Sequence, residues 1–89
     1  MLADMHLVIS PHVFSQRLGE ETVLLNADSG AYFGLTPVAS RAWELMQEGV
    51  GTREILAKLE AEFDAPSAQI EQDLEVFLLK LREKELVAF

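Results

Sequence analysis

The sequence contains no cysteine. This absence excludes disulfide bonds, thiolate metal sites and a cysteine nucleophile. It is compatible with a reducing environment, and we expect the chain to work in the cytoplasm. No apolar run approaches the roughly 20 residues that a membrane-spanning helix needs. Residues 1–10 lack the basic start and the small-residue cleavage site of a signal peptide, so we do not expect them to act as one.

Positive charge is also scarce. The chain carries 7 lysine and arginine residues against 15 aspartate and glutamate residues, a formal net charge of -8. An acidic surface repels phosphate backbones, because nucleic-acid binding depends on lysine and arginine. It likewise disfavours anionic membranes. We therefore expect neither nucleic acid nor a membrane as a partner, whereas a somewhat basic partner is compatible with this charge.

The length and the hydrophobic content indicate one folded domain. With 89 residues the chain can form a single domain with a modest core. A hydrophobic fraction of 49% is that of a globular protein rather than of a disordered one. No internal repeat, linker or low-complexity segment divides the sequence. We expect a single domain over residues 1–89, with its core formed by about residues 8–88.

The first half of the chain has the pattern of short strands. Residues 12–18 alternate between two faces, residues 22–25 are strongly apolar, and residues 31–35 are rich in aromatics. Turn-forming residues separate these segments at 19–21 and 26–30. The spacing predicts a three-stranded antiparallel meander.

The second half changes to helical spacing. The first helix starts at an N-cap, Thr36, and ends at a pair of glycines. The second has Thr52 as its cap and Phe63 on its buried face. The third opens at Pro66 and runs to about residue 84.

Both ends of the chain contain apolar residues. Residues 1–10 are expected to form a loosely held terminus with an extended stretch at 7–9. Residues 86–89 form an apolar tail that either packs back on the domain or adds a short strand.

The predicted fold is α+β, a three-stranded antiparallel sheet followed by three helices, and it resembles a winged helix-turn-helix. A DNA-binding protein of this kind places its third helix in the major groove. Residues 66–85 carry more acidic than basic side chains, so this helix would meet phosphates with net repulsion. A DNA-binding module therefore stays as an alternative, and a structural or oligomerising domain is another.

No constellation of residues points to catalysis or to a metal. His6 and His12 are the only histidines, and apart from the weak pair of Asp4 and His6 neither has a partner at metal-ligand spacing. The serines lack the strand-to-helix elbow of a hydrolase, and the glycines are too isolated to cradle a phosphate. No two carboxylates are placed to form an acid–base site. We expect no catalytic residue, no metal and no cofactor, in a protein that is not an enzyme.

The third helix has more apolar surface than one core needs. At about 100° per residue its core-facing side chains share one direction, and beside them lies a flank with an apolar centre and a charge of each sign. This flank consists of Gln69, Asp73, Val76 and Lys80. The strand at 31–35 would be a sheet edge, with neither charge nor proline to block pairing with another strand. Together the two surfaces predict a groove for an extended peptide.

These segments resemble those of a known family. The sequence is similar to the PqqD-like proteins, the recognition elements of pathways that modify ribosomally made peptides. The similarity rests on residues 23–26, 29–37 and 43–45 in this order and spacing, and it covers about residues 8–88. One departure is Thr36, where the family more often has asparagine, although threonine caps a helix as well.

The resemblance implies a binding function without chemistry. Family members bind the leader of a precursor peptide as a fourth antiparallel strand, beside the third strand and against the third helix, and deliver it to a maturation enzyme. Carried onto this sequence, the docking strand consists of Ala31, Tyr32, Phe33, Gly34 and Leu35. The groove flank consists of Asp73, Val76, Phe77 and Lys80, and the helical geometry adds Gln69.

The short chain looks most like the recognition proteins of lasso-peptide pathways, which work with a separate leader peptidase and a cyclase. We expect a monomer whose partner is the leader peptide. Within the family, the alternative is a stand-alone PqqD, which serves a radical SAM enzyme in quinone cofactor synthesis.

Overall fold

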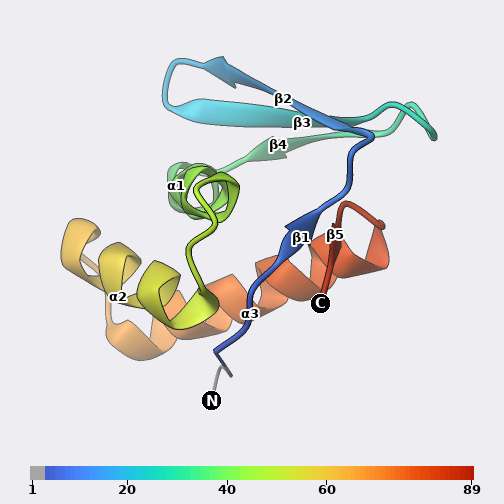
Figure 1. The fold of residues 1–89 in the computed structure, drawn as a ribbon. Helices are drawn as coiled ribbons and strands as arrows, with labels where there is room; N and C mark the ends of the chain where they lie inside the picture. The colour runs from blue at the N-terminus through green and yellow to red at the C-terminus, as the bar shows by residue number, and fades with distance from the viewer. Residues whose placement is uncertain (1–3) are drawn as a thin grey trace.

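The structure, a computed structural model, describes residues 4–89. Within this range the elements are β1 (Val8–Ile9), β2 (Val13–Leu18), β3 (Glu21–Asn26), β4 (Tyr32–Leu35), α1 (Pro37–Gln47), α2 (Thr52–Glu62), α3 (Ser67–Glu83) and β5 (Val87–Ala88). The sheet formed by β2, β3 and β4 lies over α1, and α2 and α3 lie on the other side of α1 (Figure 1). The predicted α+β order, a three-stranded antiparallel sheet followed by three helices, is confirmed.

The sheet is a meander in the order β2-β3-β4. A two-residue turn joins β2 to β3, and Gly19 takes a φ of 67° there, a left-handed conformation that glycine adopts without steric cost. β3 is longer than the predicted strand at 22–25, because Glu21 pairs with Leu18 and Asn26 pairs with Val13. β4 is shorter than predicted and begins at Tyr32. As the last strand of the meander, β4 is an edge of this sheet.

The two ends of the chain pair with each other. β1 and β5 form a two-stranded antiparallel sheet in which Val8 faces Ala88 and Ile9 faces Val87. The extended stretch predicted at 7–9 is confirmed for residues 8–9, and the tail forms the short strand that was one of its two expected alternatives. The prediction of a loosely held terminus is wrong for residues 4–10, whereas residues 1–3 lie outside the described residues.

A threonine stands at the start of each of the first two helices, but only the first of them is an N-cap. Thr36 caps α1 as predicted, with its Oγ1 accepting a hydrogen bond from the N–H of Ala39 at 3.2 Å. Thr52 does not cap α2: it is the first helical residue, and the N-cap is Gly51. Its buried hydroxyl instead accepts from the N–H of Met5 at 2.8 Å, and its own N–H donates to the Met5 carbonyl. Thr52 therefore ties the N-terminal segment to α2.

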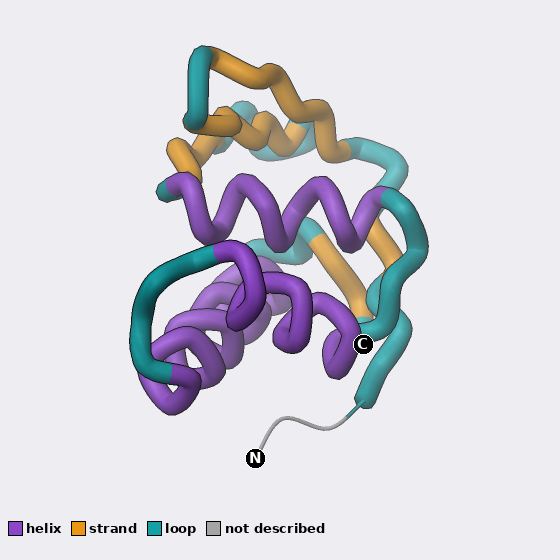
Figure 2. Tube along the Cα trace, turned by 90° about the vertical axis from the view of Figure 1, so that its left-hand side faces the viewer, coloured by secondary structure: helices purple, strands orange, loops and turns teal. Residues whose placement is uncertain are grey.

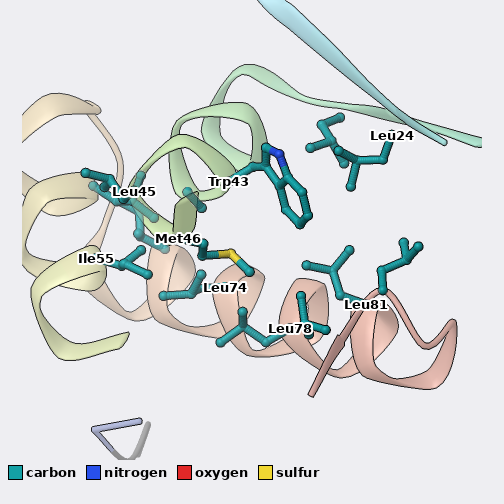
Figure 3. Close-up of a cluster of buried hydrophobic side chains, with 14 residues drawn as sticks. Leu24, Trp43, Leu45, Met46, Ile55, Leu74, Leu78 and Leu81 are labelled. Carbon is teal, nitrogen blue, oxygen red and sulfur yellow. The ribbon is translucent and has the colours of Figure 1, made fainter. Parts of the chain in front are cut away.

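The core is centred on α1, the middle layer between the sheet and the other two helices (Figure 2). Trp43 is only 2% exposed, and its indole is directed from α1 into the space between Leu24 of β3 and Leu81 of α3 (Figure 3). α2 ends before Phe63, which is half-buried rather than part of the buried face of the helix. Because α1 is enclosed on both sides, β4 and α3 are held at fixed positions on opposite sides of it.

Candidate functional site: a groove between the sheet edge and the third helix

An open groove of about 780 Å³ lies between β4 and α3. One wall is the edge strand, the other is a face of α3, and the start of α1 closes the bottom. The lining residues are Phe33, Gly34, Leu35, Thr36, Val38, Ala39, Ala42, Leu59, Gln69, Gln72, Asp73, Leu74, Val76, Phe77, Lys80, Leu81, Lys84 and Leu86. Most of this lining is apolar, and the polar groups are concentrated on α3.

The hydrogen-bond register of β4 decides which backbone groups face this groove. The N–H of Asn26 donates to the carbonyl of Ala31 at 2.8 Å, so these two residues form a hydrogen-bonded pair. In an antiparallel ladder such pairs alternate with non-hydrogen-bonded ones. Phe33 and Leu35 therefore bond to β3, whereas the N–H and C=O groups of Tyr32 and Gly34 point toward the open edge. A guest strand can bond to these four groups.

The side chains of β4 alternate between the two faces of the sheet, and the residues whose backbone bonds to β3 are those whose side chains face the core. Phe33 and Leu35 face the core side of the sheet: Leu35 is buried, and Phe33 is half-buried against the core and at the wall of the groove. Tyr32 faces outward and is 74% exposed. A Cβ added at Gly34 would meet nothing within 4 Å, so Gly34 contributes its backbone to the site rather than a close contact.

The wall formed by α3 has an apolar centre between polar ends. Val76 is 59% exposed, a large fraction for an apolar side chain in a helix that packs on a core. The amide of Gln69 donates to the carboxylate of Asp73 at 3.4 Å, one turn along the same face. Lys80 supplies a positive charge one turn beyond Val76. This wall can hold an apolar side chain and distinguish the two directions of a bound chain by charge.

Most of the residues predicted from the sequence come together in this groove: Phe33, Gly34, Leu35, Gln69, Asp73, Val76, Phe77 and Lys80 all line it. Ala31 and Tyr32 do not. Ala31 lies just before β4 and lines a neighbouring pocket, and Tyr32 projects from the outer face of the sheet.

Sequence reasoning missed the lining residues at the start of α1, one of α2, three of α3 and two beyond its end: Thr36, Val38, Ala39, Ala42, Leu59, Gln72, Leu74, Leu81, Lys84 and Leu86. Val38 and Ala39 look like ordinary members of the apolar stripe of α1, and only the tertiary arrangement leaves them half-buried at the bottom of the groove. Lys84 directly follows α3, and no pattern in the sequence places it beside the sheet. Its ammonium lies 5.8 Å from the centroid of the Phe33 ring, a cation–π arrangement between the two walls of the groove. Gln72 carried no signal that separates it from an exposed helical residue.

The residues that line the groove provide backbone hydrogen-bonding groups, apolar surface and a few charges, which are groups for binding a ligand. Among residues 4–89 there is no group of three or more histidine, aspartate or glutamate side chains that could hold a metal ion. His12 lies on the surface, 3.6 Å from the carboxylate of Asp28. No helix within the described range has the length and apolar character needed to cross a membrane.

An open strand edge beside an apolar groove is the arrangement of proteins that bind an extended peptide by strand addition. The chain belongs to the PqqD family: the family described as coenzyme PQQ synthesis protein D (PqqD) matches residues 21–87. The resemblance seen in the sequence is therefore confirmed. No match is found among curated protein sequences.

Two solved structures are similar to this chain. One is described as TbiB1 in complex with the TbiA(beta) leader peptide; it is 41% identical, with a TM-score of 0.83, over 90% of this chain and 93% of that one. The other, lasso peptide synthetase B1 complexed with the leader peptide, is 19% identical, with a TM-score of 0.84, over 96% of this chain and 100% of that one. At that identity the second structure shows the shared fold only.

Proposed function

We propose that this protein binds the leader segment of a ribosomally synthesised precursor peptide and presents it to the enzymes that process the precursor. The observation that carries the proposal is the register of β4, which directs the backbone groups of Tyr32 and Gly34 toward an apolar groove. The leader would add to β4 as a fourth antiparallel strand. The complex of the 41% identical TbiB1 with a leader peptide supports this assignment.

The geometry of the groove defines what it selects. In a strand paired with β4, alternate side chains point inward, beside Phe33 and Leu35. They would be enclosed from the other side by Val76 and Phe77 of α3. The leader should therefore carry apolar side chains two positions apart, and backbone hydrogen bonds would contribute affinity that does not depend on its sequence.

A lasso-peptide pathway is the more specific proposal. It is supported by the identity to TbiB1 and by the fold shared with a lasso peptide synthetase B1. In such a pathway the protein would act as a cytoplasmic monomer without chemistry of its own and would present the leader to a separate peptidase and a cyclase. Service to a radical SAM enzyme in quinone cofactor synthesis is the alternative, which the family assignment supports.

The direct test is a fluorescence titration with the labelled leader of the precursor encoded beside this chain, with a scrambled leader and duplex DNA as control ligands. Saturable binding of the true leader alone is expected. Val76→Glu should weaken it at least tenfold, because a carboxylate would enter an apolar groove. The matched control is Leu79→Glu: Leu79 is 51% exposed on the same helix but does not line the groove. Binding that is equally insensitive to both substitutions would place the leader elsewhere.

A further inference from the structure

The charged residues that line the groove are Asp73, Lys80 and Lys84, and they are distributed unevenly along it. Asp73 lies in the first half of α3, whereas Lys80 lies near the end of the helix and Lys84 directly after it. Two of the chain's 7 basic residues therefore line the groove, but only one of its 15 acidic residues does. One end of the groove has an excess of positive charge in a protein whose net charge is -8.

The two lysines stand one above the other on the groove wall, and the protein does not neutralise them. The N–H of Lys84 donates to the Lys80 carbonyl at 3.0 Å, so the two are one helical turn apart, a spacing at which like charges repel. Within residues 4–89 neither ammonium belongs to an ion pair, whereas Arg17 and Arg41 are each paired with a carboxylate. A carboxylate from outside the protein could relieve this repulsion.

The helix dipole alone does not explain this arrangement. Positive charge near the C-terminal end of a helix is favourable. Arg82 supplies such a charge too, but its guanidinium lies 4.7 Å from the centroid of the Phe89 ring and lines neither the groove nor the pocket next to it. Glu83 and Glu85 likewise line the neighbouring pocket and not the groove. The dipole therefore favours cations at this end of α3, but it does not decide that both lysines face the groove.

The direction of β4 determines which part of a guest would reach the lysines. The start of β4 and the end of α3 lie on the same side of the molecule (Figure 1), in agreement with the contact between Phe33 and Lys84. A guest strand antiparallel to β4 therefore runs in the direction of α3, with its N-terminal residues near Asp73, and leaves past the lysines. The inference rests on the proposed function, because it takes the guest to be the leader.

Strand geometry narrows the contact to one position of the leader. The leader residues opposite Leu35, Phe33 and Ala31 would follow one another at intervals of two and point to the same inner face. The first two are the apolar positions of the proposed function. The third lies about 7 Å further along, a little more than one helical turn, which places it beyond Val76 and beside the lysines.

We propose that Lys80 and Lys84 bind an aspartate or glutamate side chain of the leader, two residues after its second apolar position. The leader would then present two apolar side chains and one acidic side chain at alternate positions. This charge fixes the register and the direction of the leader, which backbone hydrogen bonds do not. A leader bound in the reverse direction would place its carboxylate beside Asp73, where the two would repel each other.

The test begins with an alanine scan of the labelled leader of the precursor encoded beside this chain, which locates the two apolar positions by their loss of affinity. The residue two positions after the second of them is then replaced by Glu, Gln and Lys, and the Kd of each peptide is measured at low and at high salt. The glutamate peptide should bind about fivefold more tightly than the lysine peptide at low salt, and the difference should shrink at high salt. The same replacements one position earlier, on the outward face, should have no such effect.

Three variants of the protein identify the residues responsible. Lys80→Gln with Lys84→Gln should abolish the preference for glutamate, and Lys80→Glu with Lys84→Glu should reverse it in favour of the lysine peptide. The matched control is Arg53→Gln with Lys58→Gln, which removes the same two charges from exposed residues of α2 that do not line the groove. This variant should keep the full preference.

The proposal is overturned if the glutamate and lysine peptides bind equally, if the preference lies at another position, or if it survives the loss of both lysines. An equal loss in the α2 control would also overturn it, because the preference would then come from the overall charge of the protein. In all these cases the leader still binds. Failure of the leader to bind, or binding that is insensitive to Val76→Glu, would instead overturn the proposed function.

Discussion

The N–H of Asn26 donates to the carbonyl of Ala31 at 2.8 Å, and this bond sets the phase of the whole β3–β4 ladder. Shifted by one residue, the ladder would direct the backbone of Phe33 rather than that of Gly34 to the open edge. The bond also places Tyr32 and Gly34 on the outer face of the sheet, so that the residues offering backbone groups to a guest keep their side chains out of the groove.

The first prediction is that Gly34→Pro weakens leader binding about tenfold and leaves the fold intact. Proline removes an N–H that faces the edge, and its ring obstructs the approach of a partner strand. A Cβ has room at this position, because nothing lies within 4 Å of it. Leader affinity by titration and thermal unfolding followed by circular dichroism check the two halves of the prediction.

The opposite edge of the sheet provides the control. The N–H of Ala27 donates to the His12 carbonyl at 2.8 Å, and by the same alternation the N–H of Ser15 points out from β2. Ser15→Pro is therefore the same kind of change at the other edge, away from the groove, and leader affinity should be unchanged. Equal losses from both prolines would show that they act through the stability of the sheet.

The second prediction concerns the charge on the groove wall. Lys80→Glu should change the affinity for the leader by less than about fivefold, because Lys80 is exposed and rim charges contribute roughly 0–1 kcal/mol. The change should shrink as salt is added, since exposed charges are screened. Lys58→Glu on α2 makes the same change of net charge outside the groove and should have no effect. A loss that persists at high salt would mean that Lys80 is desolvated in the complex.

Residues that act through local geometry could be predicted from the sequence. The flank of Asp73, Val76 and Lys80 follows from helical spacing alone, and the edge position of the third strand follows from the meander. The N-cap role of Thr36 could also be predicted, because it depends only on neighbouring residues. The hydrogen bond that Thr36 accepts from the N–H of Ala39 confirms it.

Contacts between distant residues could not be predicted in this way. Thr52 has the local signature of an N-cap, yet its hydroxyl is used by Met5, 47 residues earlier in the chain. The strand pair of residues 8–9 with 87–88 likewise joins the two ends of the chain, and no periodicity within either segment reveals its partner. The register of β4 depends on how the turn at 26–30 closes, and alternation in the sequence does not determine that.

The third prediction is a pH dependence at the interface of the first two helices. The guanidinium of Arg41 on α1 bonds to the carboxylate of Glu62 on α2 at 2.8 Å. This hydrogen bond lowers the pKa of Glu62 below its usual range and raises that of Arg41. A carboxylate whose pKa is lower in the folded state stabilises that state above its unfolded pKa of about 4.3 and loses the contribution as the pH falls through the folded value.

Glu62→Gln should therefore destabilise the protein slightly at pH 7, and the difference from the unsubstituted protein should vanish in acid. Urea unfolding from pH 7 to pH 3, followed by the fluorescence of Trp43, measures this; Trp43 is the only tryptophan. Glu60→Gln removes the same charge from an exposed position of α2 and serves as the control. A difference that stays constant with pH would assign the effect of Glu62→Gln to packing.

The last prediction concerns the residue that turns the chain from α3 into β5. Glu85 has a φ of 60°, the only positive φ of a non-glycine residue among those described. Its N–H donates to the Arg82 carbonyl, and the N–H of Leu86 donates to the Leu81 carbonyl. These are the two hydrogen bonds of the Schellman motif, in which the position of Glu85 is usually a glycine. A left-handed conformation costs a residue with a Cβ roughly 1–2 kcal/mol. Glu85→Gly should therefore stabilise the protein by about 1 kcal/mol, since part of the gain is offset by the freer unfolded chain.

The neighbouring residue tests the cause. Lys84 has a φ of -86°, which any residue adopts, so glycine at this position gains nothing in the folded state. Lys84→Gly should be less stable than Lys84→Ala by about 0.5–1 kcal/mol, and the comparison with alanine sets aside the cation–π contact of Lys84 with Phe33. Opposite signs at adjacent positions, measured by urea unfolding, would show that backbone conformation decides the effect. Destabilisation by both would mean that the Glu85 side chain makes an interaction worth more than its strain. The stability of this turn matters because it positions the buried Leu86 and Val87, through which the C-terminal strand holds β1 and the N-terminal segment on the domain.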